Sequence, residues 1–192
     1  TQGNSTGHYA YTESSCPDIG HSDKVAILYS RCFNFSNIIA PELSYAYHMF
    51  GEETGNIQVE VSTNSCVSWS PIDILDGPRQ DSSSAGWKTR LVNMVQFSGA
   101  PNVRIRLVGT TGRDQFSDMA IDDIRVQEAP ANDLALTEIL TPVSRCGLGE
   151  AESVSVRIEN LGYQSQTDFD ISYQIDGGAT VTETFEGVLP GG

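Results

Sequence analysis

Two adjacent aspartates, Asp122 and Asp123, lie at the centre of the stretch DMAIDDIRV, residues 118–126. The apolar residues around them are typical of a β-strand, but Asp is depleted in strands and two adjacent like charges repel each other. Successive side chains of a strand point to opposite faces, so only one of the two carboxylates can face the interior. A buried carboxylate needs a counter-charge or hydrogen-bond donors. The pair therefore predicts a compensating partner, and the backbone amides of a bend are one candidate.

Histidine is the usual proton-transfer group near neutral pH, and the chain holds three: His8, His21 and His48. The sequence contains no HExxH or GxSxG motif and no glycine-rich phosphate loop. In the stretch GHSDK, His21, Ser22 and Asp23 are adjacent, but neighbours on an extended chain point to alternate sides and cannot form a relay. We therefore predict that the chain is not an enzyme.

Two tryptophans and one acidic stretch are further candidates for ligand binding. Trp69 and Trp87 would form a sugar-stacking platform on an exposed face, whereas a Trp in a β-sandwich more often packs in the core. The stretch DILDGPRQDSSSAGW, residues 73–87, has three aspartates near a glycine but lacks the spacing of a calcium loop. A hairpin loop is the preferred interpretation of this stretch.

The composition describes a folded and strongly acidic protein. Of 192 residues, 39% are hydrophobic and 19% are charged, and 25 Asp and Glu against 11 Lys and Arg give a net charge of -14. Such a charge repels nucleic acid and anionic membranes, and no apolar run approaches the roughly 18 residues of a membrane span. We expect neither nucleic-acid binding nor membrane insertion. Because the start, TQGNSTGHYAY, lacks the features of a signal peptide, we expect a removed leader or a piece of a longer protein.

The four cysteines, Cys16, Cys32, Cys66 and Cys146, do not have the spacing of a zinc site. Disulfides or free buried thiols are the remaining alternatives. Cys16 and Cys32 flank the apolar run 25–29 in a way that permits a bridge closing this loop. The low content of Lys and Arg, together with abundant Ser, Thr, Asn and Gly, suits a secreted chain.

Alternation with period two recurs along the chain, whereas helical periodicity is nearly absent. In NVRIRLVG, Val103, Ile105 and Leu107 share one face, and NIQVEVS and LSYAYHMF repeat the pattern. Further strand candidates are residues 8–12, 25–30, 90–97 and 119–126. Seven or more such strands separated by turn signals predict an all-β sandwich.

The stretch QEAPANDLAL marks a domain boundary, since Pro130 cannot donate to a strand ladder and a new strand pattern begins after it. We predict one domain over residues 1–128 and another over 129–192. The second has four strand candidates, at 133–140, 152–159, 168–175 and 180–185, too few for a whole immunoglobulin-like domain. Residues 128–192 carry 11 acids against 2 bases, which is typical of a solvated spacer.

The order of several motifs resembles that of the MAM domain, a jelly-roll-like β-sandwich of extracellular proteins that is related to cleaved-adhesin domains. The motifs are TGHYAYTESS, AILYSRC, LSYAYHMFGEETGNIQVEV, GWKTRLVNMV, VRIRLVGTTG and DMAIDDIRV, and they span roughly residues 5–127. Residues 133–192, with DLALTEI and VSVRIENLG, more loosely resemble the CARDB-type immunoglobulin-like repeats of secreted bacterial proteins.

This resemblance implies a structural calcium ion, held by an inward-facing Asp122 and, as a second choice, by Asp118. Calcium takes six to eight oxygen ligands, and a carboxylate of the closing strand would supply one. MAM domains also begin with an upstream strand that is not found in this chain. We therefore expect an unpaired strand edge beside an apolar groove, filled by the upstream part of the precursor or by another chain.

These observations lead to one functional prediction and one alternative. The chain is predicted to be a non-catalytic adhesion or binding module of a secreted multidomain protein, with an extracellular peptidase as the first candidate for the parent. The module is predicted to attach to a protein or glycoprotein surface. The alternative is a carbohydrate-binding module of a secreted polysaccharide-degrading enzyme, with Trp69 and Trp87 as its ligand-binding aromatics.

Overall fold

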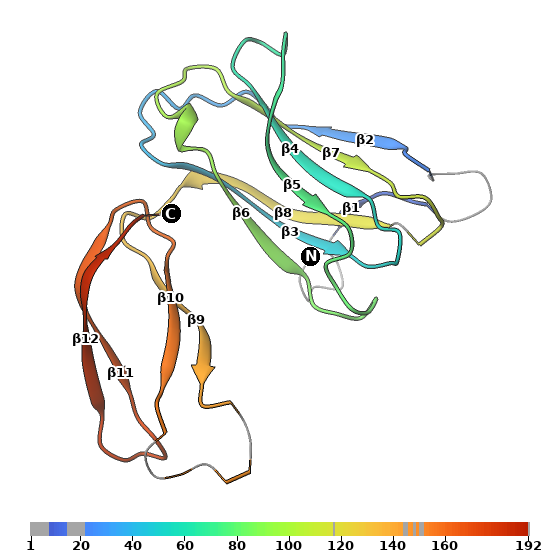
Figure 1. Ribbon diagram of the computed structural model, residues 1–192. Coiled ribbons are helices and arrows are strands. Elements are labelled where there is room, and N and C mark those ends of the chain that lie inside the picture. The colour runs from blue at the N-terminus through green and yellow to red at the C-terminus, as the bar shows by residue number, and fades with distance from the viewer. Residues whose placement is uncertain are drawn as a thin grey trace. The chain divides into compact units, whose positions relative to one another are not determined.

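The computed structural model describes residues 8–14, 22–116, 118–143, 146–147, 149 and 152–191. These residues form twelve strands and one short 3-10 helix, in two compact units that cover residues 1–128 and 129–192 (Figure 1). No helix in the described ranges is long and apolar enough to cross a membrane. The elements are β1 (Ala10–Tyr11), β2 (Val25–Tyr29), β3 (Pro41–Met49), β4 (Asn56–Ser62), β5 (Ser70–Asp76), β6 (Lys88–Asn93), η1 (Val95–Phe97), β7 (Arg104–Thr110), β8 (Met119–Glu128), β9 (Leu134–Thr141), β10 (Ser155–Asn160), β11 (Gln166–Tyr173) and β12 (Val181–Leu189).

The first unit is a sandwich of two four-stranded antiparallel sheets. Sheet A has the strand order β1-β8-β3-β6, and sheet B has the order β2-β7-β4-β5. Consecutive strands alternate between the two sheets except for β4 and β5, which pair as neighbours within sheet B, and this is the strand arrangement of an eight-stranded jelly roll. The predicted all-β, jelly-roll-like fold of this part of the chain is therefore confirmed.

The core lies between the two sheets and follows the predicted alternation. Leu43, Tyr45, Tyr47 and Met49 of β3 all face it and are buried. Strands β4 and β7 contribute alternate residues in the same way, as their sequences predict. The core residues of these two strands are Ile57, Val59, Val61, Ile105 and Leu107.

One edge of the sandwich, formed by β5 and β6, is closed by an ion pair between the sheets. Arg90 of β6 donates from Nε to Oδ2 of Asp73 on β5 at 3.0 Å, and a second guanidinium nitrogen contacts Oδ1. These hydrogen bonds raise the pKa of Arg90. The hairpin-loop interpretation of residues 73–87 is wrong at its start, because Asp73 and Asp76 belong to β5. An edge strand tolerates the Pro71 and the aspartates that obscure its sequence pattern.

The opposite edge, formed by β1 and β2, is open. Among the residues that the structure describes, each of these strands has a partner strand on one side only, and between them lies an apolar groove of about 210 Å³. Leu28 faces inward, opposite the buried Leu107, and yet it is 42% exposed. An unpaired edge beside an apolar groove is what the sequence led us to expect. What fills the groove stays a prediction.

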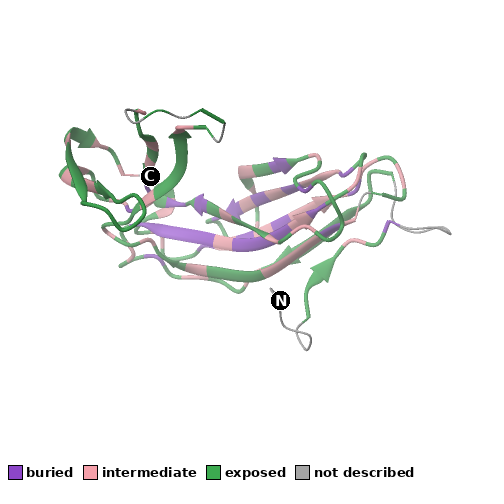
Figure 2. Cartoon of the chain, turned by 90° about the horizontal axis from the view of Figure 1, so that it is seen from below, coloured by how far each residue is buried: buried purple, intermediate pink, exposed green. Residues whose placement is uncertain are grey.

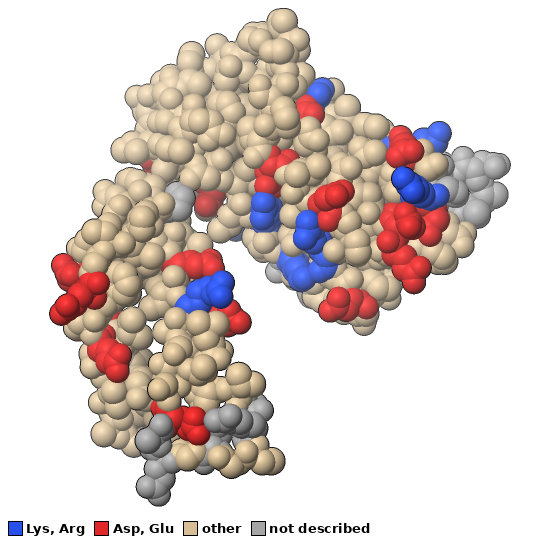
Figure 3. All heavy atoms as spheres, in the orientation of Figure 1, with Lys and Arg blue, Asp and Glu red and all other residues tan. Residues whose placement is uncertain are grey.

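The second unit consists of two two-stranded antiparallel sheets, β9 with β10 and β11 with β12. Phe169 and Phe185 stack across the second pair, with ring centroids 4.9 Å apart. Most of the described residues of these strands are exposed, as the green of this unit in Figure 2 shows. Acidic side chains are spread over the visible face of this unit in Figure 3. Its assignment as an immunoglobulin-like spacer stays a prediction.

Candidate functional site

The two aspartates of DMAIDDIRV lie at an irregularity in the pairing of β3 with β8. Ser44 pairs with Arg125 and Ala46 with Asp122, so the register shifts at Asp123. The bulged strand has one extra residue there, and Asp123 has a φ of 48°, a conformation that Asp adopts more readily than most residues. A bend, which is one of the alternatives for this pair, is therefore present in the form of a β-bulge, whereas the compensating partner of the pair stays a prediction.

Asp122 lies on the outer face of sheet A. Its neighbour Ile121 packs against the core and pairs with the core residue Tyr47, so the next side chain along β8 points the other way. The prediction that Asp122 faces inward is wrong. Alternation shows that Asp122 and its neighbours point to opposite faces of the sheet, but it does not show which of the two faces is buried. Its role as a calcium ligand is a separate question.

Asp118 holds the segment after β1 against the start of β8. Its Oδ1 accepts hydrogen bonds from the backbone N–H of Ser14 at 2.8 Å and from the Ser14 hydroxyl, whose oxygen lies 2.7 Å away. Ser14 is fully buried. Two donors therefore compensate the charge of this carboxylate.

Asp118 and Asp122 cannot bind one calcium ion together. At about 3.3 Å per residue of extended chain, they stand about 13 Å apart. Calcium binds its oxygen ligands at roughly 2.3–2.6 Å. Within the described ranges, no three His, Cys, Asp or Glu side chains come together to hold a metal. The calcium site at Asp122 stays a prediction.

The cysteines whose surroundings the structure describes are not bridged. Cys32 and Cys146 are exposed thiols, and Cys66 is half-buried, with its Sγ 3.4 Å from Nη1 of Arg104. Cys16 lies outside the described residues. The structure therefore does not show the predicted Cys16–Cys32 disulfide, in which Cys32 would be bridged rather than a free thiol, and the bridge stays a prediction.

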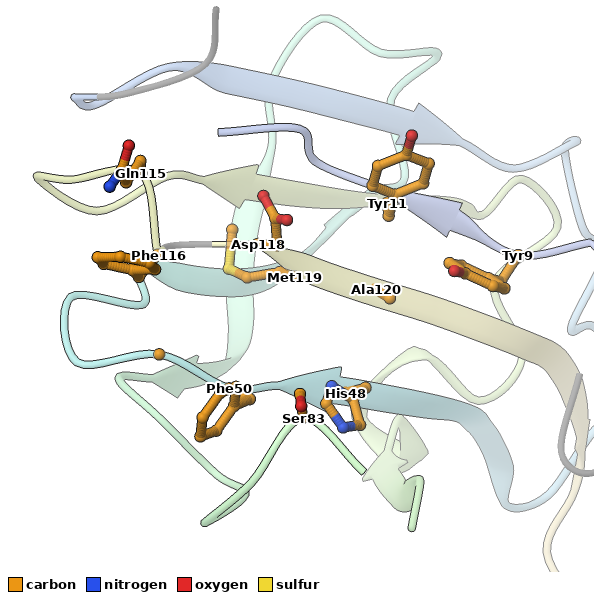
Figure 4. A pocket seen from close by; sticks show the side chains of 11 residues that line it. Tyr9, Tyr11, His48, Phe50, Ser83, Gln115, Phe116, Asp118, Met119 and Ala120 are labelled. Atoms are coloured by element: carbon orange, nitrogen blue, oxygen red, sulfur yellow. The ribbon is translucent and has the colours of Figure 1, made fainter. Parts of the chain in front are cut away.

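A groove of about 760 Å³ runs over the outer face of sheet A. Its floor follows from the strand register, since Ala120 pairs with Tyr11 on one side and with His48 on the other. Directly opposed residues project to the same face of a sheet, so Tyr11, Ala120 and His48 form one row of side chains. The small alanine in the middle leaves a hollow between the two rings. Figure 4 shows β8 along the floor, with Tyr9 and Tyr11 on one side and His48 and Ser83 on the other.

One end of the groove is formed by two phenylalanines from different loops. Phe116, just before β8, is 59% exposed, and Phe50, just after β3, is 39% exposed. Gly51 brings the two loops together. It has a φ of 140°, and a Cβ at this position would lie 1.6 Å from the carbonyl oxygen of Phe116. A residue without a side chain is therefore required for this close approach.

An aromatic ledge, defined as Tyr9, Tyr11 and Trp87, borders the groove. The ring centroid of Tyr9 lies 5.9 Å from that of Tyr11 and 5.4 Å from that of Trp87, and Trp87 lies 6.0 Å from His48. Tyr9 and Tyr11 are 53% and 58% exposed, and Trp87 is half-buried on the outer face rather than in the core. Nε2 of His48 is buried and has no hydrogen-bond partner among the described residues.

Trp69 belongs to a separate cluster on sheet B. Arg106 lies over its ring at 4.4 Å, Tyr29 contacts it with ring centroids 5.7 Å apart, and Glu60 binds the same arginine. The two tryptophans therefore do not form one platform. Arg106 already covers a face of Trp69, which leaves Trp87 as the tryptophan beside the groove.

The sequence pointed to Trp87 and Asp118 as site residues, but it did not point to the other aromatic side chains beside the groove, Tyr9, Tyr11, Phe50 and Phe116. One signal was available, because Tyr9 and Tyr11 are two residues apart in a strand candidate and must share a face. The phenylalanines are in loops, where no periodicity identifies them.

The fold and the groove define a β-sandwich with a ligand-sized, largely aromatic hollow on an outer sheet face. The model of the family described as "MAM domain, meprin/A5/mu" matches residues 1–132, and the chain belongs to this family. Among solved structures, it is similar to two cleaved adhesin domains of Lys-gingipain from Porphyromonas gingivalis. One is 13% identical, with a TM-score of 0.46 over 62% of this chain and 73% of that one. The other is 11% identical, with a TM-score of 0.43 over 64% and 76%.

Proposed function

We propose that the chain is a non-catalytic attachment module that binds a protein or glycoprotein surface through the groove on sheet A. The observation that carries this proposal is the concentration of exposed aromatic side chains around one hollow. Rigid aromatic rings provide large contact areas at low cost in conformational entropy, and they dominate many binding sites. Membership of the MAM family supports a binding role for residues 1–132.

The parent of the module is proposed to be a secreted or cell-surface protein, with an extracellular peptidase as the first candidate. The acidic surface, with a net charge of -14 over the chain, disfavours nucleic acid and anionic membranes as partners. The upstream part of the precursor, or another chain, is proposed to fill the groove between β1 and β2. An extended segment there would add backbone hydrogen bonds to an unpaired edge and cover the apolar side chains.

A structural calcium ion is proposed on the family resemblance alone, with Asp122 as a ligand. The carboxylate on the outer face would supply one oxygen and neighbouring groups the rest. Since a cation that binds only the folded state stabilises it, chelation should lower the melting temperature.

The proposed function is tested by measuring how strongly immobilised extracellular glycoproteins retain the purified chain. Tyr11→Ala and Phe116→Ala each remove a ring from the groove. Neither side chain makes a hydrogen bond among the described residues. Tyr29→Ala is the matched control, because it removes a half-exposed, outward-facing tyrosine from the edge strand of sheet B. Retention that falls with the two groove variants and not with the control supports the proposal. Equal retention of all four proteins would contradict it.

A further inference from the structure

The groove on sheet A combines aromatic rings with side chains that can exchange hydrogen bonds. Its lining includes Tyr9, Tyr11, Ser83, Gln115 and Asp118 (Figure 4). These residues present rings, a hydroxyl, an amide and a carboxylate over the same hollow. A ligand that matches this surface has an apolar face to stack on a ring and hydroxyl groups around its rim.

A peptide main chain finds few partners in this groove. At the floor, β8 is paired on both sides, with β1 and β3, so its N–H and C=O groups are already in the ladders. Beyond β1 the ladder continues, since the N–H of Thr12 donates to the carbonyl oxygen of Met119 at 2.9 Å. Strand addition, the usual way in which a sheet binds an extended peptide, is therefore not available on this face. A ligand in this groove must therefore be bound by the side chains of the protein, which is how proteins bind sugars.

The charge of the groove restricts the ligand further. No Lys or Arg is among the described residues that line it, whereas Asp118 is. Residues 1–127 carry 14 acids against 9 bases. A sialylated, sulfated or uronic-acid glycan would meet repulsion without a compensating cation.

From this combination we infer that the groove binds an uncharged pyranose oligosaccharide, stacked on the aromatic ledge and seated in the hollow above Ala120. The inference rests on the proposed function and names the chemistry that the module recognises on its target surface. A volume of about 760 Å³ lies within the roughly 300–1,000 Å³ range of small-molecule sites, so a short stretch of a glycan chain fits.

Two variants test the groove, one by removing a ring and the other by filling the hollow. Tyr11→Ala removes a stacking ring, and Ala120→Leu fills the hollow without removing any contact group. Ala120 points outward, so a larger side chain there does not enter the core. The controls are two changes on sheet B, Tyr29→Ala and Gln58→Leu. Gln58 lies between the core residues Ile57 and Val59 of β4, so its side chain points to the outer face of that sheet.

The probes are an array of neutral gluco-, manno-, galacto- and xylo-oligosaccharides with sialylated, sulfated and uronic-acid counterparts. Isothermal titration of the strongest neutral probe into each protein then gives the affinities. We expect at least one neutral probe to bind and the anionic probes not to bind. Each groove variant should weaken binding about tenfold or more, whereas each control should leave it unchanged. Melting curves show whether each variant is folded.

The inference is overturned if no neutral probe binds at about 5 mM, if the anionic probes bind more tightly, or if both groove variants bind as well as the wild type. Enzymatic removal of glycans from the immobilised glycoproteins separates this inference from the proposed function. Attachment that survives deglycosylation and still requires Tyr11 means that the groove binds protein, so the attachment function stands and the glycan inference fails. Attachment that none of the groove variants reduces contradicts both.

Discussion

Replacing Asp118 with alanine should destabilise the first unit through the loss of two hydrogen bonds to Ser14. Hydrogen bonds to a charged acceptor contribute about 1.5–3 kcal/mol each, and a buried donor left without a partner keeps its desolvation penalty. Asp118 is half-buried, so solvent screens part of its charge and the lower part of this range applies. Two bonds at 2.7 and 2.8 Å then predict a loss of about 3–4 kcal/mol in the free energy of unfolding.

The assay is urea denaturation of wild type, Asp118→Ala, Asp118→Asn and Ser14→Ala, with and without a calcium chelator. Asp118→Asn keeps one acceptor oxygen and should lose about half as much as the alanine variant, with an unchanged denaturant slope. Combining Asp118→Ala with Ser14→Ala should cost less than the sum of the single changes, because both remove the same hydroxyl–carboxylate bond. A loss below about 0.5 kcal/mol for Asp118→Ala would refute the hydrogen-bond account. If chelation of the wild type reproduces the whole loss, a metal and not Ser14 compensates this carboxylate.

Four further predictions concern other parts of the first unit. Burial raises the pKa of Tyr45, whose hydroxyl has no hydrogen-bond partner among the described residues. Above about pH 10 the tyrosine ionises more readily in the unfolded chain than in the folded one, so the free energy of unfolding should be constant below this pH and fall above it. Tyr45→Phe should weaken this decline in pH-dependent denaturation and leave stability at pH 7 unchanged or higher, whereas a marked loss would reveal a missed partner. Asp73→Ala should cost about 1–2 kcal/mol in denaturation, since it leaves Arg90 without its partner, and Arg90→Lys should cost less than the alanine change. Chelation of calcium should lower the melting temperature of the wild type, and Asp122→Asn should lower it to the same extent and make the protein insensitive to the chelator. If the chelator leaves the wild-type melting curve unchanged and elemental analysis finds no calcium, the protein has no structural calcium ion. Peptide mapping without reduction should recover Cys16 and Cys32 in one linked fragment, and free thiols at both positions would exclude the bridge.

Much of the fold could be predicted because one face of each sheet is buried. In β3, β4 and β7 the alternation of apolar residues gives both the strand and its inward face, and all three agree with the structure. Strand β5 could not be recognised in this way. Pro71, Asp73 and Asp76 reduce its β-propensity, and only its position at an edge and the partner Arg90 make those residues compatible with a strand.

The functional face could be predicted only in part, because it depends on strand register. The sequence identifies Tyr9 and Tyr11 as neighbours on one face, but it does not reveal that Tyr11, Ala120 and His48 form a single row. The β-bulge at Asp123 also changes which later residues of β8 face the core; the adjacent aspartates indicate a bend there, but not the shift in register that it causes. Long-range pairing, rather than local propensity, therefore determines where the groove forms.

Chemical-shift mapping of the isotope-labelled chain tests most directly whether the groove on sheet A is the ligand-binding surface. The strongest neutral oligosaccharide from the array is titrated while backbone amide signals are followed. We expect the largest changes in amide chemical shift at Tyr11, His48, Phe116 and Ala120, and little change around Trp69 on sheet B. Shifts concentrated around Trp69, or no shifts near Ala120 at saturation, would contradict the claim that this groove binds the ligand.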